Sequence, residues 1–192
     1  MNLSYWEIKN WLTNIDFTIV GSGIVGLNCA LQLKQRYPTS KILILEKGFL
    51  PRGASTKIMS QVTDYVQREV LELVKKRING LRMLRETLSD KTIGYQNLGG
   101  YELFLESNEA LYNLCLTKQD EINQLLYPIF NTEVFAFKAN NLGFKNVISN
   151  YSFNQFEGQI DTGKMMDALL KKVQSLGIKI LNNTTVEAFS ED

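Results

Sequence analysis

Two short, largely apolar runs mark the first quarter of the chain. Residues 17–20 read FTIV and residues 41–46 read KILILE. Runs of this length, rich in branched side chains, predict strands of a parallel sheet that are buried on both faces. Residues 24–36 between them predict a helix that ends before Pro38. The order of strand, helix and strand predicts a right-handed βαβ unit.

The middle of the chain changes to a different pattern. Over residues 62–88 apolar positions recur at three- and four-residue steps, which predicts one long amphipathic helix that can bend at Gly80. Residues 95–106, YQNLGGYELFLE, predict two strands around a Gly-Gly turn. A helix over 108–126 follows, and Ser107 is a suitable N-cap for it.

The last third of the chain predicts strands and one further helix. Residues 133–160 are rich in strand formers. Asp161 can cap a helix that Gly177 ends, because glycine readily adopts the left-handed conformation that closes helices. Residues 178–181 and 184–189 predict two more short strands.

The N-terminal residues 1–15 form a separate amphipathic segment. They lack the basic start and continuous apolar core of a signal peptide, and no apolar run in the chain is long enough to span a membrane. Few Lys or Arg residues lie on the polar side, so docking onto the domain is favoured over membrane attachment. The apolar positions are Leu3, Trp6, Trp11, Leu12 and Ile15.

Composition narrows the classes of function. The 21 basic and 20 acidic residues give a net charge of +1, which gives no indication of a nucleic-acid partner. The chain has no histidine, which excludes Ser-His-Asp catalysis and histidine-ligated zinc within these residues. Cys29 and Cys115 are the two cysteines, too few for a disulfide framework or a four-thiolate metal site. They fit reduced thiols in a cytoplasmic protein.

Three glycines at the end of the first predicted strand carry the clearest chemistry. Gly21, Gly23 and Gly26 fit the spacing G-x-G-x-x-G between a strand and a helix. The first glycine permits the tight turn, the second permits a pyrophosphate to approach, and the third permits close packing of helix and sheet. The helix start also attracts anions through its backbone N–H groups. The alternative is an ordinary tight turn without a ligand.

Glu46 stands at the end of the second predicted strand, 20 residues beyond Gly26. An acid at this spacing accepts hydrogen bonds from an adenosine ribose, and it repels a 2′-phosphate, which disfavours NADP. The alternative is a solvated surface glutamate. Turn and acid together predict a site for the ADP half of FAD or NAD, without choosing between the two.

Four stretches of the chain carry a family resemblance. VGSGIVGLNCALQL, ILILEKG, LPRGAST and residues 157–189 resemble FAD-dependent oxidoreductases of the D-amino-acid oxidase family, such as glycine oxidase and sarcosine oxidase. The resemblance implies an α/β fold: a Rossmann-type FAD-binding βαβ core, with an inserted α+β substrate-side segment, incomplete relative to the family. It places a partial FAD-binding domain at 16–60 and 157–192, and a partial substrate-side segment at 61–156.

The resemblance also assigns cofactor contacts. It matches the glycine turn to the FAD pyrophosphate, the acid and its neighbour to the ribose, a Ser-Thr pair to the pyrophosphate and flavin side, and a valine to the adenine. For the Ser-Thr pair the alternative is a loop that caps the long helix. The positions are Gly21, Ser22, Gly23, Ile24, Val25, Gly26, Glu46, Lys47, Ser55, Thr56 and Val186.

The function that the resemblance implies is FAD-dependent oxidation of a small molecule, an amine, amino acid or 2-hydroxy acid, by hydride transfer to flavin. The chain is then the N-terminal part of such an enzyme. Two other hypotheses stay open. One is a non-catalytic, truncated remnant that does not hold FAD stably, since the stretch after Thr56 differs from the family and the chain ends at Asp192. The other is a small NAD-binding protein. No catalytic residue is assigned; structural roles are favoured for Tyr95, Tyr101 and Lys145.

Overall fold

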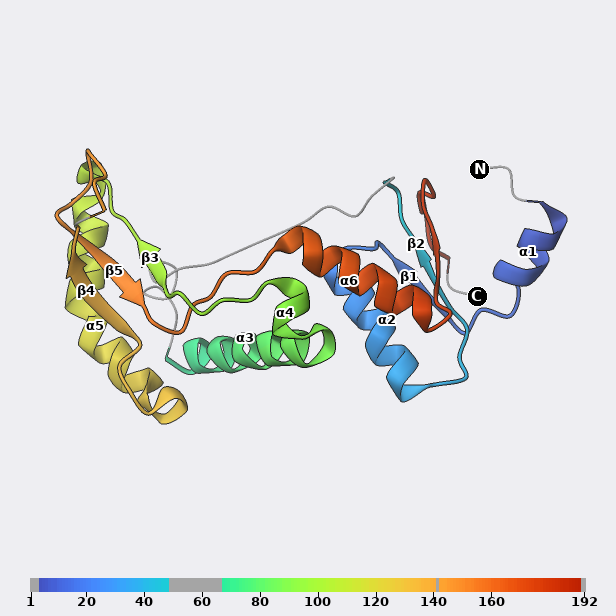
Figure 1. Cartoon of the computed structure of the whole chain (residues 1–192), viewed down its shortest axis with the longest axis horizontal. Helices are drawn as coiled ribbons and strands as arrows, with labels where there is room; N and C mark the ends of the chain where they lie inside the picture. Colours follow the sequence, from blue (N-terminus) through green and yellow to red (C-terminus); the bar gives the residue numbers. More distant parts are fainter. Residues whose placement is uncertain (1–3, 49–66, 141, 191–192) are drawn as a thin grey trace. The chain divides into compact units, whose positions relative to one another are not determined.

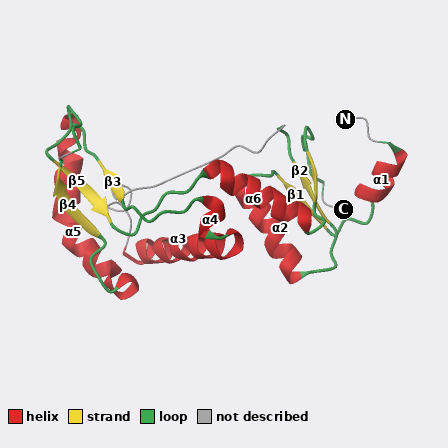
Figure 2. Cartoon of the chain, in the orientation of Figure 1, coloured by secondary structure: helices red, strands yellow, loops and turns green. Residues whose placement is uncertain are grey.

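The computed structural model describes residues 4–48, 67–140 and 142–190. The chain divides into two compact units. Unit 1 comprises residues 1–55 and 162–192, and unit 2 comprises residues 56–161. Figure 1 gives the labels of the helices and strands, and Figure 2 shows that both units mix helices with strands. Each unit is described below by itself.

Unit 1 is built on a parallel sheet of three strands. The strands are β1 (Phe17–Val20), β2 (Ile42–Leu45) and β6 (Lys179–Leu181), in the order β1-β2-β6. Ile19 of β1 stands opposite Ile44 of β2. The predicted βαβ unit and α/β fold class are confirmed, with strand ends within one residue of the prediction.

Two helices cover this sheet, α2 (Ile24–Arg36) and α6 (Thr162–Ser175), and they pack against each other. After α6 the chain turns at Gly177, whose φ of 74° is the left-handed conformation expected there. The helices and strands bury a common apolar core, made of Leu27, Ala30, Leu31, Ile42, Leu43, Ile44, Met165, Leu169, Val173, Ile178 and Leu181.

Two predictions for unit 1 strands are wrong. β1 is half-buried on one face and exposed on the other: Val20 is 54% exposed, because it lines the groove at the end of the sheet instead of packing under a helix. Residues 184–189 form no strand. They run along the end of the sheet. The backbone N–H groups of residues 183 and 184 donate to the carbonyls of residues 48 and 46, and these two bonds fix the start of the segment without a strand pairing.

The N-terminal helix α1 (Tyr5–Trp11) begins with a capping box, in which Ser4 and Glu7 bond each other's backbone. None of its residues is buried, so the predicted docking of its apolar side onto the domain is wrong. The helix is short, and its described contact with the sheet is the Trp11 ring, 5.4 Å from Lys179 Nζ. No described helix is long and apolar enough to cross a membrane.

Unit 2 contains an antiparallel sheet of three strands, β3 (Gly100–Glu102), β5 (Asn150–Asn154) and β4 (Phe135–Ala139), in the order β3-β5-β4. The predicted hairpin around the Gly-Gly turn is wrong, because β3 pairs with the distant β5 and Gln96 bridges to Gln159. Strand formation within 133–160 is confirmed.

A long helix, α5 (Glu109–Phe130), packs on this sheet. Its N-cap is Asn108 and not the predicted Ser107, which belongs to a short 3-10 helix, η2 (Glu106–Asn108). The core between helices and sheet consists of Val70, Phe104, Cys115, Ile122, Leu126, Val134 and Phe135.

One buried amide joins helix and sheet in unit 2. Asn123 of α5 accepts hydrogen bonds at Oδ1 from the backbone N–H groups of Val134 and Phe135, at 3.0 and 2.9 Å. Its Nδ2 donates to the carbonyl of Phe135 at 2.9 Å. The side chain thereby gives hydrogen-bond partners to the backbone groups at the start of β4. An apolar residue at position 123 would leave these buried groups without them.

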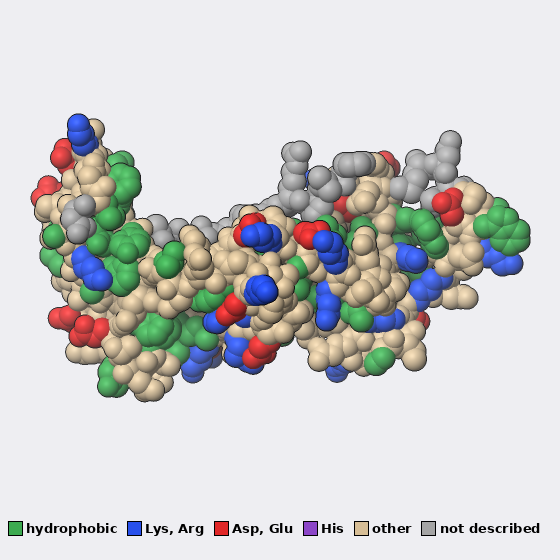
Figure 3. Space-filling model, viewed as in Figure 1, with side chains coloured by type: hydrophobic (Ala, Val, Ile, Leu, Met, Phe, Trp, Pro, Cys, Tyr) green, Lys and Arg blue, Asp and Glu red, His purple; other side chains and the backbone are tan. Residues whose placement is uncertain are grey.

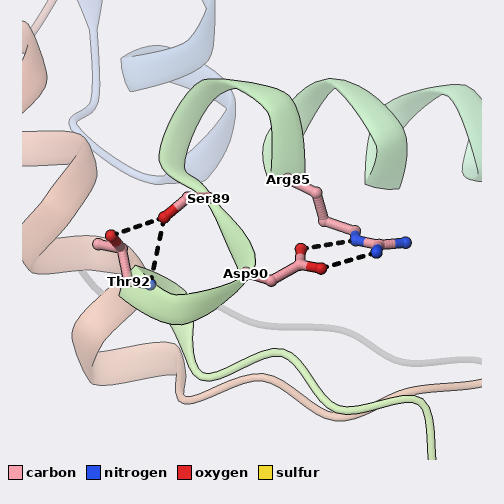
Figure 4. A network of polar contacts seen from close by, with 4 residues as sticks. All are labelled: Arg85, Ser89, Asp90 and Thr92. Carbon is pink, nitrogen blue, oxygen red and sulfur yellow. Dashed lines mark hydrogen bonds and ion pairs between the residues drawn. The ribbon is translucent and has the colours of Figure 1, made fainter.

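The helices α3 (Gln67–Leu88) and α4 (Asp90–Ile93) meet at a polar junction, drawn in Figure 4. Arg85 donates to both carboxylate oxygens of Asp90, at 2.7 and 2.8 Å. The Ser89 hydroxyl accepts from the Thr92 N–H at 3.4 Å and caps α4. Both partners of the ion pair are partly exposed, so water screens their attraction and the pair contributes little to stability.

A glycine in α3 gives a test of helix stability. Gly80 is in the helix interior, and a Cβ added there would meet no atom within 4 Å. We therefore expect Gly80→Ala to stabilise unit 2 by about 0.5–1 kcal/mol, the usual gain from replacing an interior glycine by alanine. Urea unfolding followed by circular dichroism measures the change. An unchanged or lower stability would show that α3 needs a flexible or bent point at this residue.

Candidate functional site

A groove of about 720 Å³ lies at the carboxyl ends of β1 and β2 in unit 1. Ligands of open parallel sheets bind at this end of the strands. The groove combines backbone from the glycine turn, the end of β2 and the segment after β6. Its lining residues are Val20, Gly21, Gly23, Leu45, Glu46, Lys47, Gly48, Thr184, Thr185 and Val186.

The three glycines of the turn differ in what they permit. Gly21 has a φ of 94°, a conformation that side-chain-bearing residues rarely adopt. A Cβ on Gly26 would lie 1.9 Å from the carbonyl oxygen of Gly21, so helix and turn pack too closely for any side chain. Gly23 has an ordinary extended backbone, and a Cβ there would meet no atom within 4 Å. The protein itself does not require glycine at this position, whereas a ligand in the groove would.

The start of α2 offers backbone donors to that ligand. Gly23 is the N-cap of α2, no side chain caps the helix, and its first turn contains no acidic residue. The first N–H groups of a helix have no partner within the helix and carry a partial positive charge. The helix start therefore suits a diphosphate, which the open space at Gly23 would admit.

Glu46 is tied to the glycine turn by hydrogen bonds. Its side chain is 8% exposed. Oε2 accepts from the backbone N–H of Ser22 at 2.7 Å and from the Ser22 hydroxyl at 2.9 Å. Oε1 accepts from the N–H of Gly48 at 2.7 Å. The N–H groups of Ser22 and Gly48 favour the carboxylate and lower the pKa of Glu46 from its ordinary value of about 4.5, so the group is ionised at neutral pH.

This lowered pKa predicts a pH dependence of stability. A carboxyl group with a pKa lower in the folded state stabilises the fold above its unfolded pKa, and the contribution disappears as the pH falls through the folded pKa. Glu46→Gln should therefore destabilise the chain at pH 7, and the difference from the unmodified chain should shrink as the pH falls below about 4.5. Urea titrations of both chains at several pH values measure this; a difference that is constant with pH would contradict it.

The segment after β6 completes the groove. The N–H of Thr184 donates to the carbonyl of Glu46 at 2.9 Å, and the N–H of Asn183 donates to that of Gly48 at 3.3 Å. These bonds hold the segment across the end of β2, which places the half-buried Val186 on the groove wall. A part of the chain 140 residues beyond Glu46 thus shares its site.

The structure gathers several of the sequence-predicted residues at the groove, namely Gly21, Gly23, Glu46, Lys47 and Val186. Four further predicted residues do not line the groove. Ser22 is buried within the glycine turn, and Gly26 lies in α2 against that turn. Ile24 and Val25 are exposed at the start of α2. Ser55 and Thr56 lie outside the described residues. Sequence reasoning missed Val20, Leu45, Gly48, Thr184 and Thr185, although each lies within two residues of one that it identified.

The remaining candidates are all in unit 2. Tyr95 lies under the Arg85 guanidinium, 4.1 Å from ring centroid to Cζ, next to the junction of α3 and α4. The Tyr101 ring packs on Tyr151 and Phe153. Lys145 is exposed in the loop between β4 and β5. These contacts are structural in kind, as favoured for Tyr95 and Tyr101.

Figure 3 shows acidic and basic side chains interspersed over the face that it draws, in agreement with the net charge of +1.

The parallel sheet, the glycine turn and the acid at the next strand end are features of the nucleotide-binding class of α/β folds. A family model described as FAD dependent oxidoreductase, DAO, matches residues 16–192. The chain therefore belongs to this family of FAD-dependent oxidoreductases, and the resemblance seen in the sequence is confirmed.

Three relatives with which the chain can be compared are longer than it. The bifunctional protein ThiO/ThiG of Synechocystis is 25% identical in an alignment of 186 positions, which covers 93% of this chain and 26% of that protein. L-proline dehydrogenase from P. horikoshii superposes with a TM-score of 0.59 at 19% identity, over 92% of this chain and 46% of that one. Glycine oxidase from Geobacillus kaustophilus superposes with a TM-score of 0.56 at 18% identity, over 88% of this chain and 46% of that one. The chain thus spans under half the length of these relatives.

Proposed function

We propose that unit 1 binds the ADP end of FAD in its groove and serves an FAD-dependent oxidoreductase. The observation that carries the proposal is the open space at Gly23, between an uncapped helix start and the fixed carboxylate of Glu46. We assign the pyrophosphate to the helix start, the ribose to Glu46 and the adenine to the wall around Val186. Lys47, which follows Glu46 on the same groove, adds positive charge beside the ribose.

The proposed reaction is oxidation of an amine or amino acid, for which bound FAD supplies the hydride acceptor. The two solved relatives, a proline dehydrogenase and a glycine oxidase, support this class of substrate for the whole protein. The part of this chain is to bind and orient the nucleotide end of the cofactor. We propose that unit 2 belongs to the substrate side, and that the protein is cytoplasmic, since no disulfide joins its two cysteines.

NAD would use the same ADP contacts, and family membership favours FAD. A non-catalytic remnant stays a second candidate, because the groove residues are assigned only to the ADP end of the cofactor. For the same reason we expect little or no bound flavin in the purified chain, as measured by its absorbance. A yellow protein with about one flavin per chain would exclude the remnant, while binding of NADH and not FAD would overturn the FAD assignment.

The direct test of the nucleotide site is calorimetric titration with ADP. We expect Glu46→Gln to weaken ADP binding by about 1.5–3 kcal/mol, the contribution of a hydrogen bond to a charged group. The phosphate contacts of the helix start should remain. Glu187→Gln, an exposed acid in the segment after β6, is the matched control and should leave the affinity unchanged. Equal affinity of the Glu46 variant and the unmodified chain would make Glu46 a structural residue only.

A further inference from the structure

The N-terminal helix α1 presents large apolar side chains to solvent. Tyr5, Ile8 and Leu12 follow one another at steps of three and four residues, so they share one side of the helix. They are 66%, 46% and 36% exposed. The Trp6 ring, also 66% exposed, packs edge to face on Tyr5, with ring centroids 5.2 Å apart. These four residues, the α1 surface, form a connected apolar area of the kind that marks interaction sites.

The α1 surface is an addition to the family fold. The family model begins at residue 16, after the helix has ended. The helix has a start signal of its own, the capping box of Ser4 and Glu7. Beyond its end, Lys41 Nζ donates to the carbonyl of Thr13 at 2.6 Å and attaches the segment to the start of β2. A formed helix that is attached to unit 1 therefore carries the exposed apolar side chains.

Lysine ammonium groups lie beside the aromatic rings of this segment. Lys9 Nζ is 5.9 Å from the ring centroid of Tyr5 and 5.8 Å from that of Trp6. Lys179 Nζ is 5.4 Å from the ring centroid of Trp11. Positive charge therefore accompanies the rings on α1 itself and on the neighbouring strand.

The acidic groups of the segment accept hydrogen bonds from the backbone. The Glu7 carboxylate accepts from the N–H of Ser4, and that of Asp16 accepts from the N–H of Lys41, each at 2.7 Å. Residues 4–16 and the two strand-end lysines that contact them together contain three basic and two acidic side chains. The region around α1 thus has a small excess of positive charge.

Trp, Tyr and Lys side chains in this combination are typical of surfaces that bind phospholipid bilayers. Aromatic rings with a polar edge lie at the level of the lipid headgroups, and a lysine stem follows apolar surface while its ammonium group reaches the phosphates. A protein partner, including a second copy of this chain, fits less well. The helix of seven residues is about 10 Å long, which is too short to bury the roughly 1,000 Å² of a specific interface.

We propose that α1 docks unit 1 on an anionic phospholipid surface, with the α1 surface among the headgroups and the lysines at the lipid phosphates. The helix lies in the interface and does not cross the bilayer. The sequence disfavoured membrane attachment because α1 has few basic residues, but the fold adds Lys41 and Lys179 from the starts of β2 and β6. These strand starts are at the opposite end of the parallel sheet from the nucleotide groove, so docking leaves the groove accessible.

Tryptophan fluorescence tests the proposal directly, because Trp6 and Trp11 are the two tryptophans of the chain. The full chain is titrated with vesicles of phosphatidylcholine and phosphatidylserine in equal parts, and with vesicles of phosphatidylcholine alone. With the mixed vesicles we expect a blue shift of the emission and co-sedimentation of the protein. Binding to phosphatidylcholine alone should be weaker by about fivefold or more, and added salt should weaken binding to the mixed vesicles.

Two variants test the residues. Ile8→Ser should weaken binding to the mixed vesicles by about tenfold, the usual effect of one large apolar side chain. Its matched control is Leu116→Ser, which changes a side chain of α5 in unit 2 that is 47% exposed and should leave binding unchanged. Lys9→Gln keeps the α1 surface, so it should weaken binding to the mixed vesicles only. Circular dichroism verifies that each variant is folded.

Three results would overturn the proposal. The first is the absence of a blue shift and of co-sedimentation with both kinds of vesicle. The second is equal binding to both kinds without an effect of salt, which would contradict the role given to the lysines. The third is a blue shift that grows with protein concentration in the absence of vesicles, which would place a second copy of the chain on the α1 surface. None of these results depends on ADP binding, so the nucleotide site stands or falls separately.

Discussion

Gly26→Ala should destabilise unit 1 by about 3 kcal/mol, near the upper end of the usual cost of overpacking. The added Cβ would lie 1.9 Å from the carbonyl oxygen of Gly21, far inside any normal contact. That oxygen belongs to the backbone of the turn and cannot rotate away as a side chain can. Either α2 moves off the sheet or the turn opens, and both changes expose the core around Leu27 and Ile44.

Urea unfolding at pH 7 measures this loss, and Gly23→Ala is the matched control. It adds the same methyl group three residues earlier, where no atom lies within 4 Å. Its cost should be about 1 kcal/mol or less, the usual difference between glycine and alanine at an N-cap. Equal stabilities of the two variants would mean that α2 does not pack on the turn as closely as described.

Gly23→Val should remove ADP binding while the fold remains, with at least a hundredfold loss of affinity. Gly23 has φ −68° and ψ 178°, which valine adopts readily, and the space beyond its Cα is open groove. The two methyl groups of valine would fill the place of the pyrophosphate between helix start and sheet. Calorimetry measures the affinity, and circular dichroism and urea unfolding verify that the variant is folded.

A matched control shows whether the loss is specific to the groove. Gly80→Val adds the same side chain at a glycine of unit 2 that has open surroundings and no positive φ, and it should leave ADP binding intact. Retention of ADP affinity by Gly23→Val, in a folded protein, would show that the phosphate does not approach α2 at this residue.

Local patterns predicted the nucleotide half of the molecule well. The turn, the acid and the parallel pairing of the first two strands all arise within residues 16–46, where each prediction rests on neighbours in sequence. The apolar run of β2 correctly predicted that this strand is buried. The apolar run of β1 predicted the same burial wrongly, because Val20 is apolar and faces the groove. Hydrophobicity alone does not separate a core residue from one that lines a binding site.

Predictions that depend on distant partners were less successful. The Gly-Gly stretch predicted a local hairpin, but β3 pairs with β5, about 50 residues away, and no local signal specifies such a partner. Residues 184–189 have the composition of a strand and lie instead along the end of the sheet, tied to Glu46 and Gly48. The hydrogen bonds of Ser22 to Glu46 could not be predicted from the sequence either, because the direction of a side chain in a turn depends on the conformation of the folded turn.

A crystal structure of the chain with ADP tests the central claim most directly, the claim that the groove of unit 1 binds the nucleotide end of a dinucleotide. It should show the diphosphate at the N–H groups that begin α2, the ribose beside Oε1 of Glu46 and the adenine against Val186. ADP bound at any other surface, or with its phosphates away from Gly23, would contradict the account.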